Sequence, residues 1–184
     1  MISIDAKEIE KAKSLLKNYP QQVIAAAASA INRTSAMVKT EVSKTIRKNY
    51  LISAKDIKST LSIKRASRLK LTGMISSIGQ APLITAFRVR AYKKGPVRVQ
   101  VMKKNKPKPV LGLFIGSSLK GYVGAMQRKN LSMRYPLRIP HGPSVPQMFS
   151  ADRSMSVIAP FAEKTLNRRF LHEVSYRYGK FGGR

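Results

Sequence analysis

The sequence contains no cysteine and no tryptophan, and aromatic residues make up only 7% of its 184 residues. Without cysteine the chain forms neither disulfides nor thiolate metal sites, which agrees with assembly in a reducing cytoplasm. Because large rings are scarce, the volume of a core must come mainly from Ile, Leu, Val, Met and Ala. The hydrophobic content of 43% still predicts a folded protein, and the length suits a single domain over residues 1–184.

Acidic residues are scarce as well, since 8 Asp and Glu stand against 36 Lys and Arg, for a formal net charge of +28. Repulsion at this charge destabilises a compact monomer, so an anionic partner is expected: nucleic acid, an acidic protein surface or a membrane surface. No segment approaches the roughly 18 apolar residues of a spanning helix, and the first residues alternate charged with apolar side chains, unlike a signal peptide. We therefore expect no insertion into a membrane.

The sequence contains few of the residue types that catalysis needs. His141 and His172 are the only histidines, and a lone histidine on a helix is usually a surface or packing residue. His172-Glu173 does not extend to a zinc-binding H-E-x-x-H pattern, because Tyr176 occupies the second histidine position. The glycines at 112 and 116 lack the spacing of a phosphate-binding loop. The sequence predicts no enzyme, no metal site and no cofactor.

A long helix is predicted from Pro20 to about Tyr50, with Pro20 in its first turn. At 100° per residue its small apolar side chains form one shallow stripe, which suits close packing against a sheet. The stripe consists of Ile24, Ala27, Ala28, Ile31, Ser35, Val38, Val42, Thr45 and Ile46. The opposite face is basic and carries Arg33, Lys44, Arg47 and Lys48.

Three further helices are expected. Residues 5–17 form a short N-terminal helix within the segment 1–19, and Ser53 caps another over Ala54–Leu61. Residues 152–178 form the last helix, because Leu166, Phe170 and Val174 recur at every fourth position. Pro160 either starts or kinks that helix, and Gly179 ends it, leaving residues 179–184 as a mobile tail.

Between these helices, from Ser62 to about Arg138, the apolar residues alternate with period two. Residues 87–92 and 97–101 form a hairpin with its turn at 93–96, and three other stretches are strand candidates. These candidates are residues 69–79, 110–116 and 136–139. The predicted class is α+β, with a long N-terminal helix and a C-terminal helix packed on an antiparallel β-sheet.

Two basic segments are interpreted as loops that become ordered when a partner binds. Residues 103–109 (KKNKPKP) contain four lysines and two prolines, and residues 117–130 combine glycines with basic side chains. We expect both loops to contact neighbouring subunits or DNA in a lumen. The side chains expected to make these contacts are Lys103, Lys104, Lys106, Lys108, Lys120, Arg128 and Lys129.

Two functions fit a basic protein without catalytic groups. A free nucleic-acid-binding protein of the ribosome-associated type would interleave aromatic platforms with basic groups, and Tyr92 and Tyr122 are weak examples. No base-reading motif accompanies them. The other possibility is an assembly protein whose basic faces dock on acidic neighbours.

The order of several segments resembles the phage minor tail protein Z family, also called tail completion proteins. The helix contains AINRT (30–34) and is followed by VSKTIRKNYLISAKDIKSTLSIKRAS. Later come PLITAF (82–87), one residue longer than the family's Pro-Leu-x-x-Phe segment, then LRIPHGPSVPQMF (137–149) and RRFLHEVSYRY (168–178). The likeness covers residues 22–178, and residues 103–109 are the part without a counterpart.

This resemblance implies a structural protein that completes the head-proximal end of a phage tail and joins it to the head–tail connector. It implies a ring of copies, taken as six, through which DNA passes, and no cofactor or catalytic residue. The implied partners are other copies of the chain, the tail tube or tail terminator protein, the connector proteins and non-specific DNA in the lumen. The implied location is the virion tail at the head–tail junction, after assembly in the host cytoplasm.

The size of the charge indicates what such a ring would face. Six copies would carry +168, whereas a ring about 40 Å high encloses only about 24 phosphate charges of duplex DNA. Most of the basic surface is therefore expected to meet acidic protein. We predict that the partner interface includes the basic side chains of both long helices. These are Arg33, Lys44, Arg47, Lys48, Arg168 and Arg169.

Overall fold

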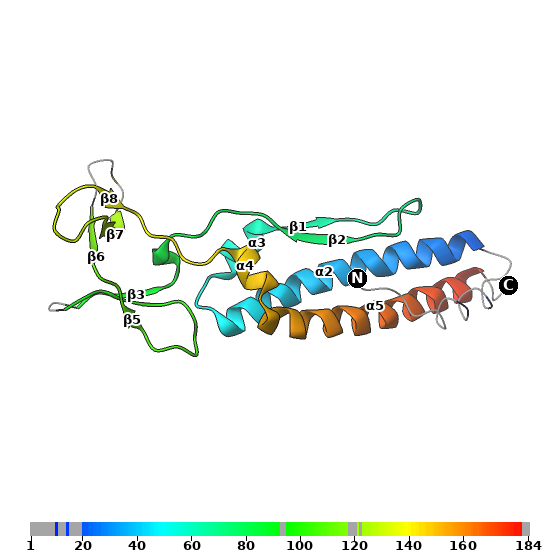
Figure 1. Cartoon of the computed structure of the whole chain (residues 1–184). Helices are drawn as coiled ribbons and strands as arrows, with labels where there is room; N and C mark the ends of the chain where they lie inside the picture. Colours follow the sequence, from blue (N-terminus) through cyan, green and yellow to red (C-terminus); the bar gives the residue numbers. More distant parts are fainter. Residues whose placement is uncertain are drawn as a thin grey trace. The chain divides into compact units, whose positions relative to one another are not determined.

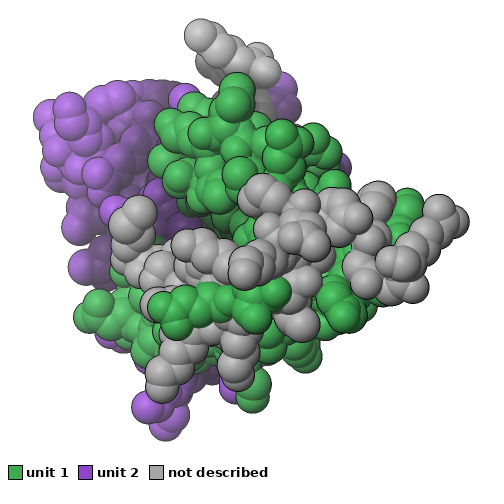
Figure 2. All heavy atoms as spheres, turned by 90° about the vertical axis from the view of Figure 1, so that its right-hand side faces the viewer, with its two compact units in different colours: residues 1–43, 61–77, 150–184 green, residues 44–60, 78–149 purple. Residues whose placement is uncertain are grey.

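In the computed structural model, the described residues are 10, 14, 20–92, 95–117, 121 and 123–181. The chain divides into two compact units (Figure 2). Unit 1 comprises residues 1–43, 61–77 and 150–184, and unit 2 comprises residues 44–60 and 78–149. The expectation of a single domain over residues 1–184 stays a prediction, and each unit is described by itself.

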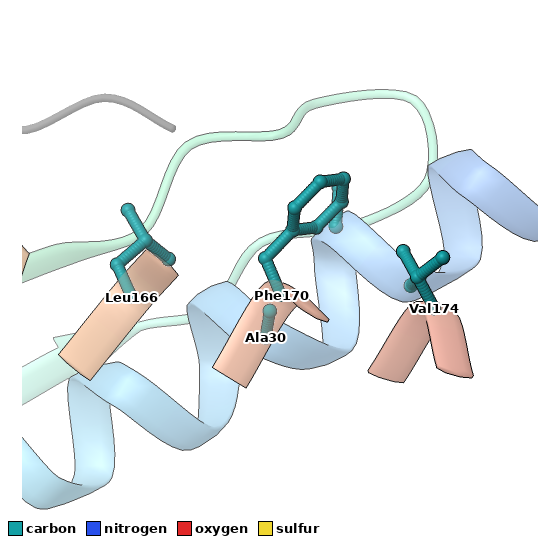
Figure 3. Close-up of a cluster of buried hydrophobic side chains, with 6 residues drawn as sticks. Ala30, Leu166, Phe170 and Val174 are labelled. Atoms are coloured by element: carbon teal, nitrogen blue, oxygen red, sulfur yellow. The ribbon is translucent and has the colours of Figure 1, made fainter. Parts of the chain in front are cut away.

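Unit 1 is built on two helices of 30 residues each, α2 (Pro20–Asn49) and α5 (Asp152–Phe181), of which the end of α2 extends into unit 2. The two helices lie side by side in unit 1 (Figure 1). Their contact is a cluster of small side chains from α2 and large ones from α5 (Figure 3). The cluster consists of Ala26, Ala27, Ala30, Leu166, Phe170 and Val174. Alanines on one helix allow the larger side chains of the other to reach its backbone, which is why this core needs few aromatic rings.

Unit 1 also contains the antiparallel ribbon β1 (Leu61–Lys64) and β2 (Met74–Ser77). Its connecting segment packs directly on α2, since a Cβ at Gly73 would lie 2.6 Å from Ile31 Cγ2. The Asn32 side chain also donates to the Ala66 carbonyl (2.9 Å) and accepts from the Ala66 N–H (2.8 Å). The small side of α2 thus contacts both a helix and the loop of a small ribbon.

Besides the end of α2, the described residues of unit 2 form two small antiparallel sheets and three short helical segments. One sheet has the order β3 (Arg88–Arg90), β4 (Arg98–Gln100), β5 (Lys108–Pro109), and the other β6 (Leu113–Ser117), β7 (Val123–Arg128), β8 (Leu137–Arg138). The helical segments are α3 (Ala54–Thr60), the 3₁₀ turn η1 (Ile84–Ala86) and α4 (Val145–Ser150). Val97, Val99, Leu113 and Ala125 form the core shared by the two sheets.

The α+β class and the two long helices are confirmed, as is the antiparallel pairing of the 87–92 and 97–101 segments, through β3 and β4. Ser53 caps α3 as expected, because its Oγ accepts the Asp56 N–H at 3.1 Å. The sheet region differs in detail, since the strands that the structure describes form three small sheets instead of one. Short strands interrupted by Pro and Gly cannot build a wide ladder.

Several boundaries predicted from the sequence are wrong. Residues 123–128, expected in a loop, form β7, and α5 continues through Gly179 to Phe181, since a glycine without a left-handed φ does not end a helix. Ile24, expected on the buried stripe, is 40% exposed because α5 packs along Ala26 and Ala30. The helix expected over residues 5–17 is described only at its helical residues 10 and 14, and residues 182–184 lie outside the described part.

Candidate partner-binding surfaces

The structure first shows where enzyme-like chemistry is missing. Among the described residues, no group of three or more His, Asp or Glu side chains is placed to hold a metal ion. His141 and His172 are both exposed. A hollow of about 410 Å³ in unit 2 is open to solvent, and apolar side chains, three hydroxyl side chains and Asp56 line it. Its acidic residue, Asp56, accepts a hydrogen bond from the Ser53 hydroxyl at 2.8 Å, as part of the cap of α3.

The basic face predicted on α2 is exposed. Arg33, Lys44, Arg47 and Lys48 all have solvent-accessible side chains, because the small apolar residues of α2 occupy its other side. Arg33 belongs to the unit 1 part of the helix and the other three belong to the unit 2 part. Their exposure agrees with the expected role and does not by itself identify what they bind.

Arg33 has a partner within unit 1, the buried carboxylate of Glu173. The Glu173 side chain is only 4% exposed, and its Oε1 lies 3.1 Å from Arg33 Nη1. Arg177, one turn further along α5, approaches Glu173 Oε2 at 2.6 Å and donates to Ser29 Oγ (3.0 Å) and to the Ala25 carbonyl (3.3 Å). A buried acid therefore connects α5 to α2 through two arginines. The i, i+4 spacing of Glu173 and Arg177 is a sequence signal that could have indicated this pair.

The two adjacent arginines of α5, Arg168 and Arg169, differ in burial. Arg168 is exposed, whereas Arg169 is half-buried, because it lies on the side of the helix that continues through Phe170 and Glu173. Of the two, Arg168 has the accessibility that an interface with another chain requires.

The lysine-rich segment 103–109, expected to be an exposed loop, is anchored to its surroundings by backbone and side-chain hydrogen bonds. The Gln100 side chain donates to the carbonyls of Asn105 (2.7 Å) and Lys103 (3.3 Å). The Lys103 N–H donates to the Asn49 carbonyl at 2.9 Å, and Lys108 in β5 pairs with Val99 in β4. The Lys103–Asn49 bond joins residues that are distant in sequence, so composition could not reveal it. All four lysines, Lys103, Lys104, Lys106 and Lys108, are exposed on this fixed backbone.

The second expected loop also places its basic groups on regular structure. Arg128 ends β7, its guanidinium lies 5.9 Å from the centre of the Phe114 ring, and its N–H donates to the Gly112 carbonyl. Lys129 follows, with its N–H bonded to the Pro136 carbonyl at 3.1 Å, and both side chains are exposed. Lys120 lies outside the described residues.

The charge is divided unequally between the two units. Unit 2 contains 19 Lys and Arg and a single acidic residue, Asp56, for a net charge of +18. Unit 1 contains 17 Lys and Arg and seven Asp and Glu, for a net charge of +10. Every Lys and Arg that the structure describes in unit 2 is exposed. The surface of unit 2 is thus the principal anion-binding candidate of the chain.

Comparison with known families decides between the classes of basic protein. The model of the family described as prophage minor tail protein Z (GPZ) matches residues 6–177, nearly the whole chain.

The chain belongs to the prophage minor tail protein Z family.

Members of this family are structural proteins of the phage tail, so the protein is a virion tail component and not an enzyme. No curated protein and no solved structure matches the sequence. In the described part of the chain, no helix is both long and apolar enough to cross a membrane. The minor tail protein Z assignment bears out the resemblance drawn from the AINRT helix and the segments after it.

Proposed function

We propose that this minor tail protein Z completes the head-proximal end of the tail and joins it to the head–tail connector. Copies of the chain, six in the simplest arrangement, form a ring through which DNA passes. The ring contacts the tail tube or tail terminator protein on one side and connector proteins on the other. Most of its basic surface meets acidic protein, and only a minor share meets the DNA in the lumen.

The observation that carries this proposal is the net charge of +18 on the 89 residues of unit 2. Repulsion of that size opposes both compactness and self-association unless anions lie nearby. Six such units would carry +108, far more than the roughly 24 phosphate charges within about 40 Å of duplex. Acidic neighbours in the tail can supply the remainder without holding the DNA in place.

The form of the basic surface supports the same conclusion. The lysines of residues 103–109 and the terminal Arg128 of β7 are carried on backbone fixed by hydrogen bonds. A prearranged surface loses little conformational entropy on docking to another protein. The proposed interface residues Arg33, Lys44, Arg47, Lys48 and Arg168 are likewise exposed on helices.

The proposal is tested by counting copies of the chain in density-purified particles with quantitative mass spectrometry. Six copies per tail, in particles with and without packaged DNA, is the expected result. A copy number that varies with DNA content, or recovery of the chain in ribosomal or nucleic-acid fractions instead of particles, would favour the nucleic-acid-binding alternative.

A second measurement separates protein docking from DNA binding. The purified chain should bind naked duplex weakly and with a steep salt dependence, as expected for contacts with phosphates alone. Charge reversal of Lys44, Arg47 and Lys48 should leave heads and tails intact but unjoined in electron micrographs. Joined, infectious particles containing the reversed chain would overturn the proposed interface.

A further inference from the structure

Strand β6 has a free edge without the protection that edge strands usually carry. Among the described strands β6 pairs only with β7, so no described strand lies along its other edge. Outer strands normally carry charges or proline that discourage pairing with another chain. The other outer strands of unit 2 follow this rule, with Arg88 and Arg90 in β3, Lys108–Pro109 in β5 and Arg138 in β8. Strand β6 (Leu113–Ser117, LFIGS) has neither charge nor proline, although one residue in five of the chain is Lys or Arg.

The hydrogen-bond pattern shows which backbone groups this edge offers. Antiparallel partners alternate between residues that exchange hydrogen bonds and residues that do not. Because the Arg128 N–H donates to the Gly112 carbonyl, the even-numbered residues of β6 bond to β7 and the odd-numbered ones face outward. The Leu113 N–H donates to Val110 within its own turn. The outward groups therefore include the Leu113 carbonyl, both backbone groups of Ile115 and the Ser117 N–H.

The side chains along this edge are apolar on one face of the sheet. Leu113 is buried in the unit 2 core, while Ile115 is 51% exposed and Leu111 70% exposed. The opposite face presents Phe114 with the Arg128 guanidinium over its ring. An incoming strand would meet an apolar surface on one side and a positive charge on the other.

We propose that the free edge of β6 binds an extended segment of an acidic tail or connector protein as an added strand. The segment places apolar side chains beside Leu113 and Ile115 and acidic side chains toward Arg128. A strand from a second copy of this chain fits less well as the occupant, since no described strand carries an acidic side chain to place toward Arg128. Nucleic acid cannot form the alternating N–H and C=O pairing that a strand edge offers. This inference rests on the proposed function and names one binding edge within it.

The direct test uses the full chain and a short synthetic peptide of alternating Glu and Val, with binding followed by fluorescence anisotropy. A matched peptide has the same sequence but is N-methylated at alternate residues, which keeps the charge and removes strand pairing. We expect the unmodified peptide to bind at least about tenfold more tightly than the N-methylated one. Equal binding of the two would show charge attraction alone and would overturn the proposal.

Variants of β6 test whether the peptide binds at this edge. Ile115→Pro and Ser117→Pro each remove an outward N–H without removing a hydrogen bond to β7, and each should weaken binding of the alternating peptide about tenfold or more. Ile115→Thr keeps the backbone donor and loses only apolar side-chain contact, so it should weaken binding clearly less than either proline variant. If a proline variant no longer gives the circular dichroism spectrum of the folded parent chain, the two peptides compared on the parent chain still show whether strand pairing contributes to binding.

Two outcomes in particles separate this inference from the proposed function. Incorporation of Ile115→Pro at the parent copy number would overturn the β6 site while leaving the tail-completion role intact. Absence of the parent chain from particles would overturn the proposed function whatever the peptide does. A purified chain that forms oligomers lost only in Ile115→Pro would identify a second copy as the occupant and would contradict the acidic-partner proposal.

Discussion

The two units of this minor tail protein Z manage the same excess of positive charge differently. In unit 1 a buried acid, Glu173, lies between Arg33 and Arg177, and the helices around it pack through alanines. Unit 2 has one acidic residue and exposes every Lys and Arg that the structure describes. Unit 1 thus compensates part of its charge internally, whereas unit 2 leaves its charge for something outside the chain. The first arrangement is typical of a scaffold and the second of a docking surface.

The largest effect is expected from breaking the scaffold at Phe170, which is 1% exposed in the α2–α5 core. Phe170→Ala should lower the free energy of unfolding by about 4 kcal/mol, because the cavity lies between two helices that cannot close around it. Urea denaturation followed by circular dichroism measures the loss. The neighbouring Leu171 is 42% exposed, so Leu171→Ala should cost well under half as much; equal losses would contradict the assigned core.

The next effect comes from the buried acid of unit 1. Glu173→Gln should destabilise the chain by about 2 kcal/mol, because Arg177 loses its ionic partner where its own side chain is only 14% exposed. The Arg33 side chain is 59% exposed, so solvent screens its ion pair with Glu173 and the pair contributes less to stability. Glu163, exposed on the same helix, is the control, and Glu163→Gln should change stability by no more than about 0.5 kcal/mol. Indistinguishable unfolding curves for the two variants would refute the internal compensation of charge in unit 1.

A smaller, local effect is expected in unit 2 at the cap of α3. Ser53→Ala removes the acceptor for the Asp56 N–H and should cost about 1 kcal/mol. Faster amide exchange of residues 54–60, measured by mass spectrometry, would report it. Ser59 donates only to the Asp56 carbonyl, so Ser59→Ala should leave that exchange nearly unchanged.

The smallest effect on stability is expected from the four lysines of residues 103–109, whose charge we assign to binding and not to folding. Replacing Lys103, Lys104, Lys106 and Lys108 together by Gln should change the free energy of unfolding by less than about 0.5 kcal/mol, or raise it slightly, since exposed like charges are removed. The same variant should nevertheless fail to complement a tail lacking the parent chain. A strong loss of stability would mean that these lysines hold unit 2 together, and full complementation would mean that they contact nothing essential.

The sequence predicted the parts of the fold that depend on periodicity. The bounds of α2, the Leu166–Phe170–Val174 ridge of α5 and the buried Val97 and Val99 follow from spacing alone, because each repeats the geometry of its element. The family resemblance came from ordered short segments and extends over residues 6–177 in the family comparison.

Features that depend on tertiary contacts could not be predicted in this way. Strand β7 contains Gly124 and lies close to Gly121, so its composition favoured a loop, and it is a strand through its pairing with β6 and β8. The anchoring of residues 103–109 depends on Gln100 and Asn49, which carry no local signal. The free edge of β6 likewise becomes visible only when the strand order is known.

The central claim, that the basic surface of unit 2 meets acidic protein, is tested most directly by zero-length carbodiimide cross-linking of intact tails. This reagent joins lysine amines only to carboxylates in direct contact, and mass spectrometry identifies both residues. The account predicts cross-links from Lys103, Lys106 and Lys108 to Asp or Glu of other tail proteins. Lysines that form no such links, but are joined to DNA by formaldehyde in filled particles, would contradict it.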